Sequence, residues 1–241
     1  MGLRYLIAAA ILFAFARSFK PIVNKDTILL AMLTSASSFF WILGLEYVST
    51  SESAVLSYTM PLIAIPMSFL ILSEKATRRE WAGAAVGFIG ILIYSYVVFS
   101  DRVLSGLGAV LTLVNAFFWA MYTIYYRKLK NQELTSTVAT QLLFGAMLFL
   151  LITPLGYRVE LTPHFWFDLT YLSVLAAAGS LLLWNALARL NRVGKTSTLI
   201  YSTPVAVTVV QYVETSSLPP PVSLVGLCLM IFGIYISRSH T

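Results

Sequence analysis

Apolar runs of about 20 residues recur along the chain, and short clusters of charged residues separate them. A helix of that length crosses the roughly 30 Å hydrocarbon core of a bilayer. Only 11% of the 241 residues are charged and 59% are hydrophobic, whereas soluble domains carry about 25% charged residues. The pattern excludes a water-soluble fold and predicts an all-α integral membrane protein.

The apolar windows predict about nine transmembrane helices. We expect them near residues 3–16, 28–47, 53–72, 81–99, 106–126, 136–154, 168–188, 196–214 and 222–237. Connecting segments then alternate between the two sides of the membrane. One side receives Arg17, Lys20, Lys25, Lys75, Arg78, Arg79, Arg127, Lys128, Lys130, Arg189, Arg192, Lys195 and Arg238. The other receives only Arg4, Arg102 and Arg158. The positive-inside rule therefore predicts a multi-pass protein of the cell (plasma) membrane with an external N-terminus and a cytoplasmic C-terminus.

The first segment also fits a second interpretation, a cleaved secretory signal. Arg4 precedes a short apolar stretch that ends in Ala14-Phe15-Ala16, which imitates a cleavage site. Cleavage there would invert every later loop and place most of the basic residues on the outer side. The charge distribution therefore favours a first membrane helix over a signal.

An internal repeat relates the two halves of the chain. At an offset of 143 residues, without a gap, Trp41 pairs with Trp184, Tyr58 with Tyr201, Pro61 with Pro204, Gly83 with Gly226 and Gly90 with Gly233. We expect a first repeat over residues 1–100, with four helices, and a second over residues 101–241, with five. Equivalent helices start on opposite sides of the membrane in the predicted topology. The repeats would therefore be inverted, which is an architecture of secondary transporters.

Five segments, taken in order, carry a resemblance that covers nearly the whole chain. They are Arg4–Ala8, Leu45–Ala54, Pro61 followed by Leu72-Ser-Glu74, Gly83–Gly90 and Ala116–Ala120. They resemble EamA-type members of the drug/metabolite transporter (DMT) superfamily. The resemblance implies a ten-helix fold of five plus five helices, from which this chain lacks the first. Either the start codon lies downstream of the true one, or the protein has lost that helix.

Polar and aromatic residues within the predicted helices are the candidate substrate-binding residues. Asn115 lies near the middle of its helix, and Trp119 and Tyr122 follow at i+4 and i+7 on the same face. An amide at that depth should face protein or a cavity rather than lipid. This face is either a substrate-binding wall or an interhelical hydrogen bond with aromatic packing. Trp41 and Trp184 are further candidates, although an interfacial aromatic belt would also explain them.

Prolines recur at equivalent positions near the middle of two predicted helices. Pro61 and Pro204 each remove a backbone donor, so that the carbonyl four residues earlier must find another partner. Tyr58 and Tyr201 lie three residues before these helix-kink prolines and complete the candidate substrate-binding set. Kinks that only shape the packing are the alternative.

The sequence gives little support for proton coupling, metal binding, a disulfide or nucleic-acid binding. The carboxylates associated with the predicted spans lie close to their ends, at Glu46, Glu74 and Glu214, which argues against proton coupling through a mid-membrane carboxylate. The repeat partner of Glu74 is Ser217, not an acid. The one cysteine and two histidines are too scattered for a metal site or a disulfide. The basic residues form no stripe suited to nucleic acid. We therefore expect no enzyme, no catalytic residue, no metal and no cofactor.

The predicted function is a permease or exporter of a small polar metabolite, such as an amino acid or a related compound, that works by alternating access. A sugar-phosphate or nucleotide-sugar carrier is an alternative, but a phosphate should demand Lys or Arg in the cavity. A non-transporting membrane assembly subunit is the third alternative. The expected partners are the small-molecule substrate and the lipid bilayer. A stripe at Gly83, Gly87 and Gly90 suits close helix packing and could form a homodimer face.

Overall fold

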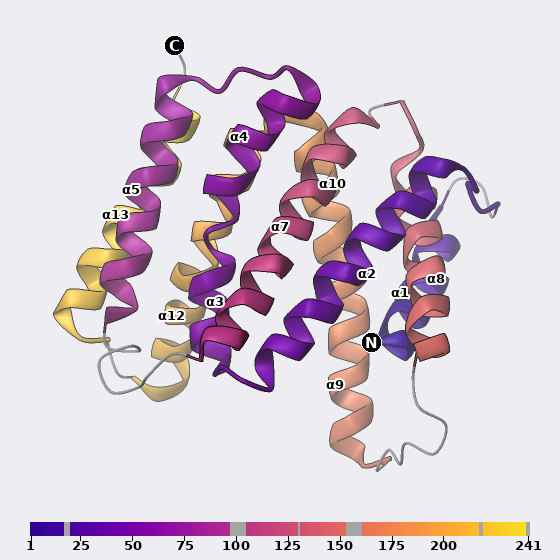
Figure 1. Ribbon diagram of the computed structural model, residues 1–241. Coiled ribbons are helices and arrows are strands. Elements are labelled where there is room, and N and C mark those ends of the chain that lie inside the picture. The colour runs from indigo at the N-terminus through magenta and orange to yellow at the C-terminus, as the bar shows by residue number, and fades with distance from the viewer. Residues whose placement is uncertain (17–19, 97–104, 130, 153–160, 217–218, 240–241) are drawn as a thin grey trace. The chain divides into compact units, whose positions relative to one another are not determined.

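The computed structural model describes residues 1–16, 20–96, 105–129, 131–152, 161–216 and 219–239, without the side chains of Gln211, Glu214 and Thr215. Within these ranges the regular structure is helical (Figure 1). The helices are α1 (Gly2–Phe15), α2 (Lys25–Leu45), α3 (Thr50–Ser57), α4 (Met60–Leu72), α5 (Arg78–Tyr94), α7 (Gly106–Lys128), α8 (Leu134–Ile152), α9 (Pro163–Ser173), η1 (Val174–Gly179), α10 (Ser180–Leu190), α11 (Val193–Ser197), η2 (Thr198–Tyr201), α12 (Ser202–Thr215) and α13 (Pro221–Arg238).

Within the described residues, each predicted span coincides with helical structure; residues 97–99 of the fourth span and 153–154 of the sixth lie outside the described residues. Three of the spans are composite. Residues 53–72 overlap α3 and α4, residues 168–188 overlap α9, the π-helical η1 and α10, and residues 196–214 overlap α11, the 3-10 turn η2 and α12. Six described segments are long and apolar enough to cross a membrane: Lys25–Leu45, Thr50–Leu72, Gly106–Lys128, Leu134–Ile152, Pro163–Leu190 and Pro221–Arg238. The multi-pass membrane fold is confirmed, and the number of nine crossings stays a prediction.

The described residues form two compact units, and each unit draws on both halves of the sequence. Unit 1 comprises Met1–Ala36 and Tyr125–Leu190, and unit 2 comprises Ser37–Ile124 and Asn191–Thr241. The boundary between them falls within α2 and within α7. The compact units therefore do not coincide with the two predicted sequence repeats.

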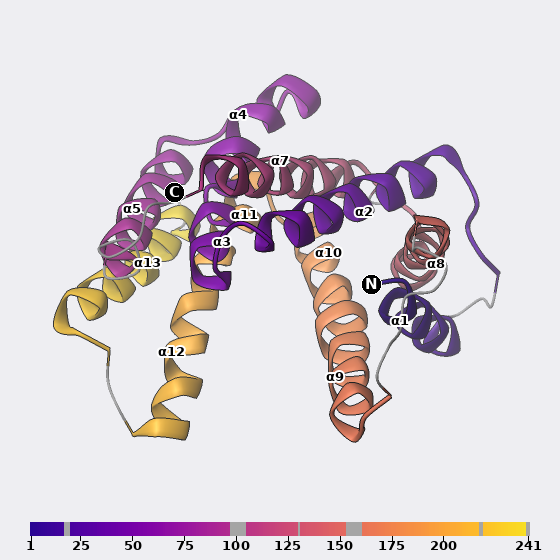
Figure 2. The same ribbon diagram turned by 60° about the horizontal axis from the view of Figure 1, so that its bottom comes forward.

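Unit 1 is built on the packing of α1 against α8 (Figures 1 and 2). Tyr5 of α1 is buried, and its ring meets that of Phe149 edge-on, with centroids 5.6 Å apart. A methyl group added at Gly145 of α8 would lie 2.9 Å from the Tyr5 ring. The absence of a side chain at Gly145 therefore allows the tyrosine to lie close against α8.

Unit 2 is built on the packing of α5 against α13, which lie side by side along their length (Figures 1 and 2). A methyl group added at Gly83 would lie 2.5 Å from the Gly233 carbonyl oxygen, and one at Gly90 would lie 2.7 Å from that of Gly226. These two pairs bring the helix backbones together. Next to them lies the unit 2 core cluster, which is formed by Val55, Ile91, Tyr201, Leu227 and Met230.

Two helices of unit 2 begin with capping boxes. The Ser49 side chain accepts from the Glu52 amide and the Glu52 carboxylate accepts from the Ser49 amide, at the start of α3. Thr77 and Glu80 make the same reciprocal pair at the start of α5. Each box satisfies backbone donors that a helix start leaves without a partner. The spacing of these residues therefore fixes where the two helices begin.

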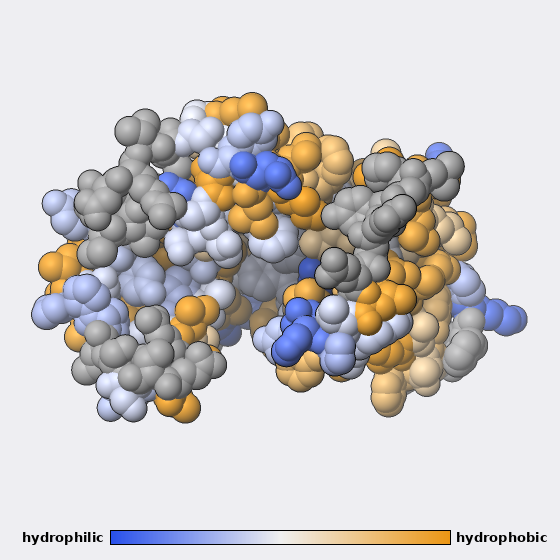
Figure 3. Space-filling model, turned by 90° about the horizontal axis from the view of Figure 1, so that it is seen from below, coloured by the Kyte–Doolittle hydropathy of each residue, from blue (hydrophilic) through white to orange (hydrophobic). Residues whose placement is uncertain are grey.

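Apolar side chains cover much of the outer surface. On α7 the exposed residues Leu107, Val110, Leu113 and Phe117 recur every three or four positions and form one apolar face. Figure 3 shows the same character more widely, with hydrophobic residues at the surface over much of the area that is not grey. Such a surface is stable where lipid rather than water surrounds it.

Candidate functional site

Asn115 connects three helices of unit 2. Its side-chain oxygen accepts a hydrogen bond from the Ser37 hydroxyl of α2 (2.7 Å), and its amide nitrogen donates to the Ser57 hydroxyl of α3 (3.1 Å). The residue is only 8% exposed. These contacts are interhelical hydrogen bonds, one of the two interpretations that sequence analysis gave for this face. A side-chain amide has two donors and two acceptor positions, so these bonds do not exhaust its capacity.

Trp119 and Tyr122 continue the Asn115 face of α7. Their ring centroids are 5.3 Å apart. Tyr122 is fully buried, whereas Trp119 is half-buried. Of these two aromatic residues, Trp119 is therefore the one that keeps surface for a further contact.

The helix that contains Pro61 is interrupted just before the proline. α3 ends at Ser57, Tyr58 and Thr59 follow, and α4 begins at Met60 with Pro61 as its second residue. The first turn of a helix tolerates proline, because its amide would have no intrahelical partner there. Pro61 thus lies in the first turn after a short break between two helical segments.

The equivalent helix of the second half is interrupted at the same place. The five-residue α11 passes into η2, which ends at Tyr201, and α12 begins at Ser202 with Pro204 in its first turn. Sequence analysis expected a kink at each of these prolines. The structure resolves them as a helix break in the first half and a 3-10 turn in the second.

Tyr58 and Tyr201 have different surroundings in spite of their equivalent positions. Tyr201 is fully buried and donates a hydrogen bond to the Ala84 carbonyl (3.0 Å). Its ring occupies the space at Gly87, where a methyl group would lie 2.3 Å from it. Tyr58 is half-buried and packs at the edge of the unit 2 core cluster. Tyr201 therefore serves packing, and Tyr58 keeps exposed surface.

The two candidate tryptophans belong to different units. Trp41 is half-buried on α2 within unit 2. Trp184 is half-buried on α10 within unit 1, where the next residue, Asn185, is fully buried. Trp184 is the only sequence-predicted site residue assigned to unit 1; the other candidates lie within unit 2.

A cluster of charges lies at one end of unit 2, and sequence analysis considered only Glu74 among its carboxylates. Glu80 is fully buried; its Oε2 accepts from the Thr77 amide (2.6 Å), and its Oε1 lies 3.2 Å from Arg192 Nε. Glu74 Oε1 accepts from the Val193 amide (2.8 Å) and lies 3.8 Å from the same Nε. The cluster joins the α4–α5 connection to the start of α11. The Thr77-x-x-Glu80 spacing of a capping box was the signal that could have identified Glu80.

In unit 1, Arg4 connects α1 to the region where α9 passes into η1. Its guanidinium donates to the carbonyls of Leu172 (3.1 Å) and Ala176 (2.9 Å). These carbonyls lie at the entry to η1 and within it, and a π-helical turn changes the regular pattern of backbone hydrogen bonds. Arg4, which sequence analysis used only as a topology marker, ties α1 to this irregular turn.

Polar contacts in unit 1 also join the start of α2 to the end of α7, and the end of α10 to the segment before α8. The Tyr125 hydroxyl donates to Asp26 Oδ1 (2.5 Å), and Gln132 donates to Asp26 Oδ2 (3.3 Å). Arg189 donates to the Gln132 carbonyl (2.5 Å). None of these groups resembles a catalytic arrangement. Among the residues that the structure describes, no group of three or more His, Cys, Asp or Glu side chains could hold a metal ion.

Comparisons with known proteins agree with this architecture. The EamA-like transporter family matches residues 1–96 and 106–239. An uncharacterized transporter in the sor 3′ region of Acidianus ambivalens is 44% identical over 239 residues, which cover 99% of this chain and 92% of the relative. An S-adenosylmethionine uptake transporter of Rickettsia felis is 27% identical over 83% of this chain and 70% of its own length.

A shorter match and a solved structure extend the comparison. A riboflavin transporter of Vibrio cholerae is 34% identical over 122 residues, which cover 50% of this chain and 38% of that protein. One protein of known crystal structure has the same fold, with a TM-score of 0.82 over 98% of this chain and 86% of its own, at 18% identity. The family match covers both halves of the sequence, and the related proteins are named as transporters rather than enzymes. The chain is therefore a membrane transporter, not an enzyme, and belongs to the EamA-like transporter family.

Proposed function

We propose that the protein is a permease of the plasma membrane that moves a small polar metabolite, such as an amino acid or a related compound, by alternating access. The observation that carries this proposal is the interruption of two helices at equivalent positions, at Tyr58-Thr59 and at Thr198–Tyr201, in a member of a transporter family. Discontinuous helices near the bilayer midplane form the substrate sites of many transporters built from inverted repeats.

The packing of α5 on α13 supports an inverted repeat of residues 1–100 and 101–241. The offset of 143 residues relates Gly83 to Gly226 and Gly90 to Gly233. The repeat partners of Gly83 and Gly233 are therefore Gly226 and Gly90, and these two glycines are also in contact. A twofold axis between the two helices would produce this exchange.

The ends of α4 and α12 add a second, independent correspondence. Ser73 directly follows α4 and Ser216 directly follows α12, and both residues have a left-handed backbone, with φ of 54° and 52°. The two serines are again separated by 143 residues. Residues other than glycine rarely adopt this conformation, so its recurrence favours a structural repeat.

The distribution of basic residues within unit 2 supports a cytoplasmic C-terminus. Arg79 donates to the carbonyl of Ser239 (3.5 Å), which directly follows α13, and Arg192 donates to the carbonyl of Lys75. Basic residues from three separate parts of the sequence thus lie at one end of unit 2. Segments rich in Lys and Arg are retained on the cytoplasmic side.

Trp119, Tyr58 and Asn115 are the residues that we propose contact the substrate directly. The two aromatic side chains keep exposed surface, and Asn115 has hydrogen-bonding capacity beyond its two serine partners. Tyr122 and Tyr201 are buried and would support this surface from behind. The named substrates of two relatives, S-adenosylmethionine and riboflavin, both contain a flat heteroaromatic ring that can stack on an aromatic side chain.

Transport into proteoliposomes tests the proposal, with a radiolabelled panel of amino acids, S-adenosylmethionine and riboflavin. We expect saturable uptake that Trp119→Ala reduces at least tenfold. Phe117→Ala is the matched control, because Phe117 lies on the exposed apolar face of the same helix. Equal loss in both variants would refute a substrate contact at Trp119. A well-folded protein that moves no member of the panel would refute the proposed substrate class.

A further inference from the structure

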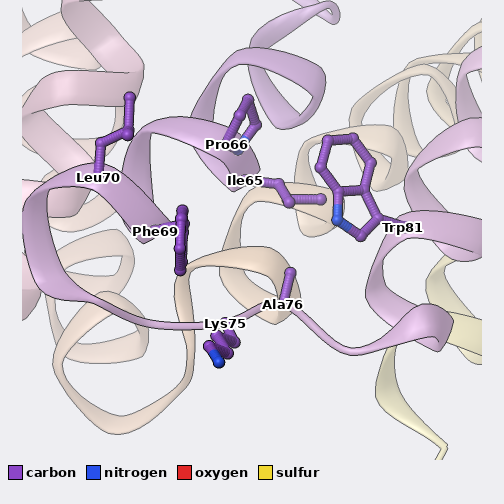
Figure 4. A pocket seen from close by; sticks show the side chains of 7 residues that line it. All are labelled: Ile65, Pro66, Phe69, Leu70, Lys75, Ala76 and Trp81. Carbon is purple, nitrogen blue, oxygen red and sulfur yellow. The ribbon is translucent and has the colours of Figure 1, made fainter.

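An open apolar groove lies between α4 and α5 of unit 2, next to the connection between these helices. It has a volume of about 500 Å³ and is lined by Ile65, Pro66, Phe69, Leu70, Lys75, Ala76 and Trp81. Figure 4 shows the α4 side chains, Trp81 of α5, and Lys75 and Ala76 of the connection around this space. We call it the α4–α5 groove.

The apolar walls of the groove are exposed. Phe69 is 49% exposed, Leu70 71% and Trp81 44%. In a membrane-spanning segment such surface faces lipid tails. A tryptophan next to a charged connection is typical of the level at which tails meet headgroups. The α4–α5 groove therefore has the depth and polarity of a site for an acyl chain.

One end of the α4–α5 groove carries positive charge. Lys75 lines the groove, and Arg78 begins α5 three residues later; both side chains are exposed. The nearby carboxylates of Glu74 and Glu80 are both directed at Arg192, with Nε to Oε1 distances of 3.8 Å and 3.2 Å. These acids are therefore engaged elsewhere, and the charge at the mouth of the groove is basic.

We propose that the α4–α5 groove binds an anionic membrane lipid, with an acyl chain against Phe69, Leu70 and Trp81 and the headgroup phosphate at Lys75 and Arg78. Basic pockets beside transmembrane helices bind such headgroups, and the cytoplasmic leaflet supplies them. The proposal holds for a membrane-spanning chain whatever its substrate is. Its failure and the failure of the transport proposal are therefore separate results.

Quenching of tryptophan fluorescence by brominated lipids tests this proposal with the full-length protein in nanodiscs. The probes are brominated phosphatidylglycerol and brominated phosphatidylcholine, each titrated over the same range of mole fractions. The difference between wild type and Trp81→Phe isolates the signal of Trp81. Trp166→Phe is the matched control, since Trp166 is also exposed, at 53%, but lies on α9 in unit 1. We expect the Trp81 signal to be quenched at a severalfold lower mole fraction of the anionic lipid.

Charge variants identify the headgroup contact. Lys75→Gln should weaken the preference for phosphatidylglycerol about fivefold, the usual contribution of one basic residue at an anionic membrane surface. Lys25→Gln, an exposed lysine at the start of α2, should leave the preference unchanged. Because the Lys75 side chain is exposed and only its carbonyl contacts Arg192, the variant should fold normally.

Three results would overturn the proposal. Equal quenching by both lipids would mean that the groove is filled by bulk lipid without selection. An anionic preference that survives Lys75→Gln would place the phosphate elsewhere. Protection of Trp81 from both lipids, in a protein that is dimeric in the nanodisc, would show that a second copy of the chain covers the groove.

Discussion

Replacing Gly83 with alanine should force α5 away from α13. The added methyl carbon would lie 2.5 Å from the Gly233 carbonyl oxygen and 2.7 Å from the Ser237 backbone nitrogen. Both are backbone atoms, so no side-chain rotation can relieve the overlap. Overpacking of this kind costs about 1–3 kcal/mol. At roughly 2–4 °C per kcal/mol for a chain of this size, the melting temperature should fall by about 2–12 °C.

Thermal unfolding in detergent, followed by circular dichroism, measures the effect. Gly226→Ala is the repeat-equivalent change, and its methyl carbon would lie 2.6 Å from the Gly90 carbonyl oxygen, so it should cost a similar amount. Gly106→Ala is the control, because no atom of the described residues lies within 4 Å of the added methyl carbon. If Gly83→Ala and Gly226→Ala both melt with wild type, the close backbone packing is wrong. If only one of them is destabilised, the twofold relation is wrong.

Three further predictions concern polar contacts. Asn115→Ala should lower the free energy of unfolding by about 1–3 kcal/mol, because it removes the bonds to Ser37 and Ser57; a melting temperature equal to that of wild type would show that neither bond stabilises the fold. Arg192→Ala should lower the melting temperature and Glu80→Gln should partly restore it in the double variant, since the single change leaves a buried carboxylate without its cation; no rescue would refute the ion pair. Burial raises the pKa of Glu133, but hydrogen bonds from Ser136 and Thr135 outweigh this effect and hold the pKa below its usual value. The Glu133 carboxylate therefore stabilises the fold at neutral pH and stops doing so as the pH falls through that lowered pKa, and Glu133→Gln should flatten this part of the melting temperature's pH dependence.

The helical segments follow directly from the sequence, because a helix that crosses a membrane must be apolar over a fixed length. The helix ends were less predictable. Glu52 and Glu80 lie just outside the predicted spans, yet the structure places both inside helices as partners in capping boxes. A hydropathy window treats a carboxylate as a boundary, although near a helix start it can satisfy the backbone amides. A search for the Ser/Thr-x-x-Glu spacing would have moved both starts back by three residues, to Thr50 and Arg78.

The sequence indicated Asn115 as a candidate site residue but not the residues that it contacts. Asn115 stood out because amides are rare at that depth, and the structure confirms that it is buried against protein. Its partners Ser37 and Ser57 did not stand out, because serine is common in membrane helices and the contacts join positions 78 and 58 residues away. The different surroundings of Tyr58 and Tyr201 could not be predicted from the sequence either. The repeat equates the two residues, and only the fold shows that Gly87 lies opposite one of them.

The π-helical turn η1 makes the two halves of the internal repeat differ in local structure. Its hydrogen bonds reach five residues back instead of four, so it takes in one more residue than a regular turn. Side chains after it are therefore rotated by about 100° around the helix axis relative to an uninterrupted α-helix. Trp184 follows this turn, whereas Trp41 lies on α2, which is a regular α-helix from Lys25 to Leu45. The two tryptophans share a register in the sequence but not a direction on their helices. A rotation that superposed the two halves would therefore not superpose these two side chains, although the sequence aligns them without a gap.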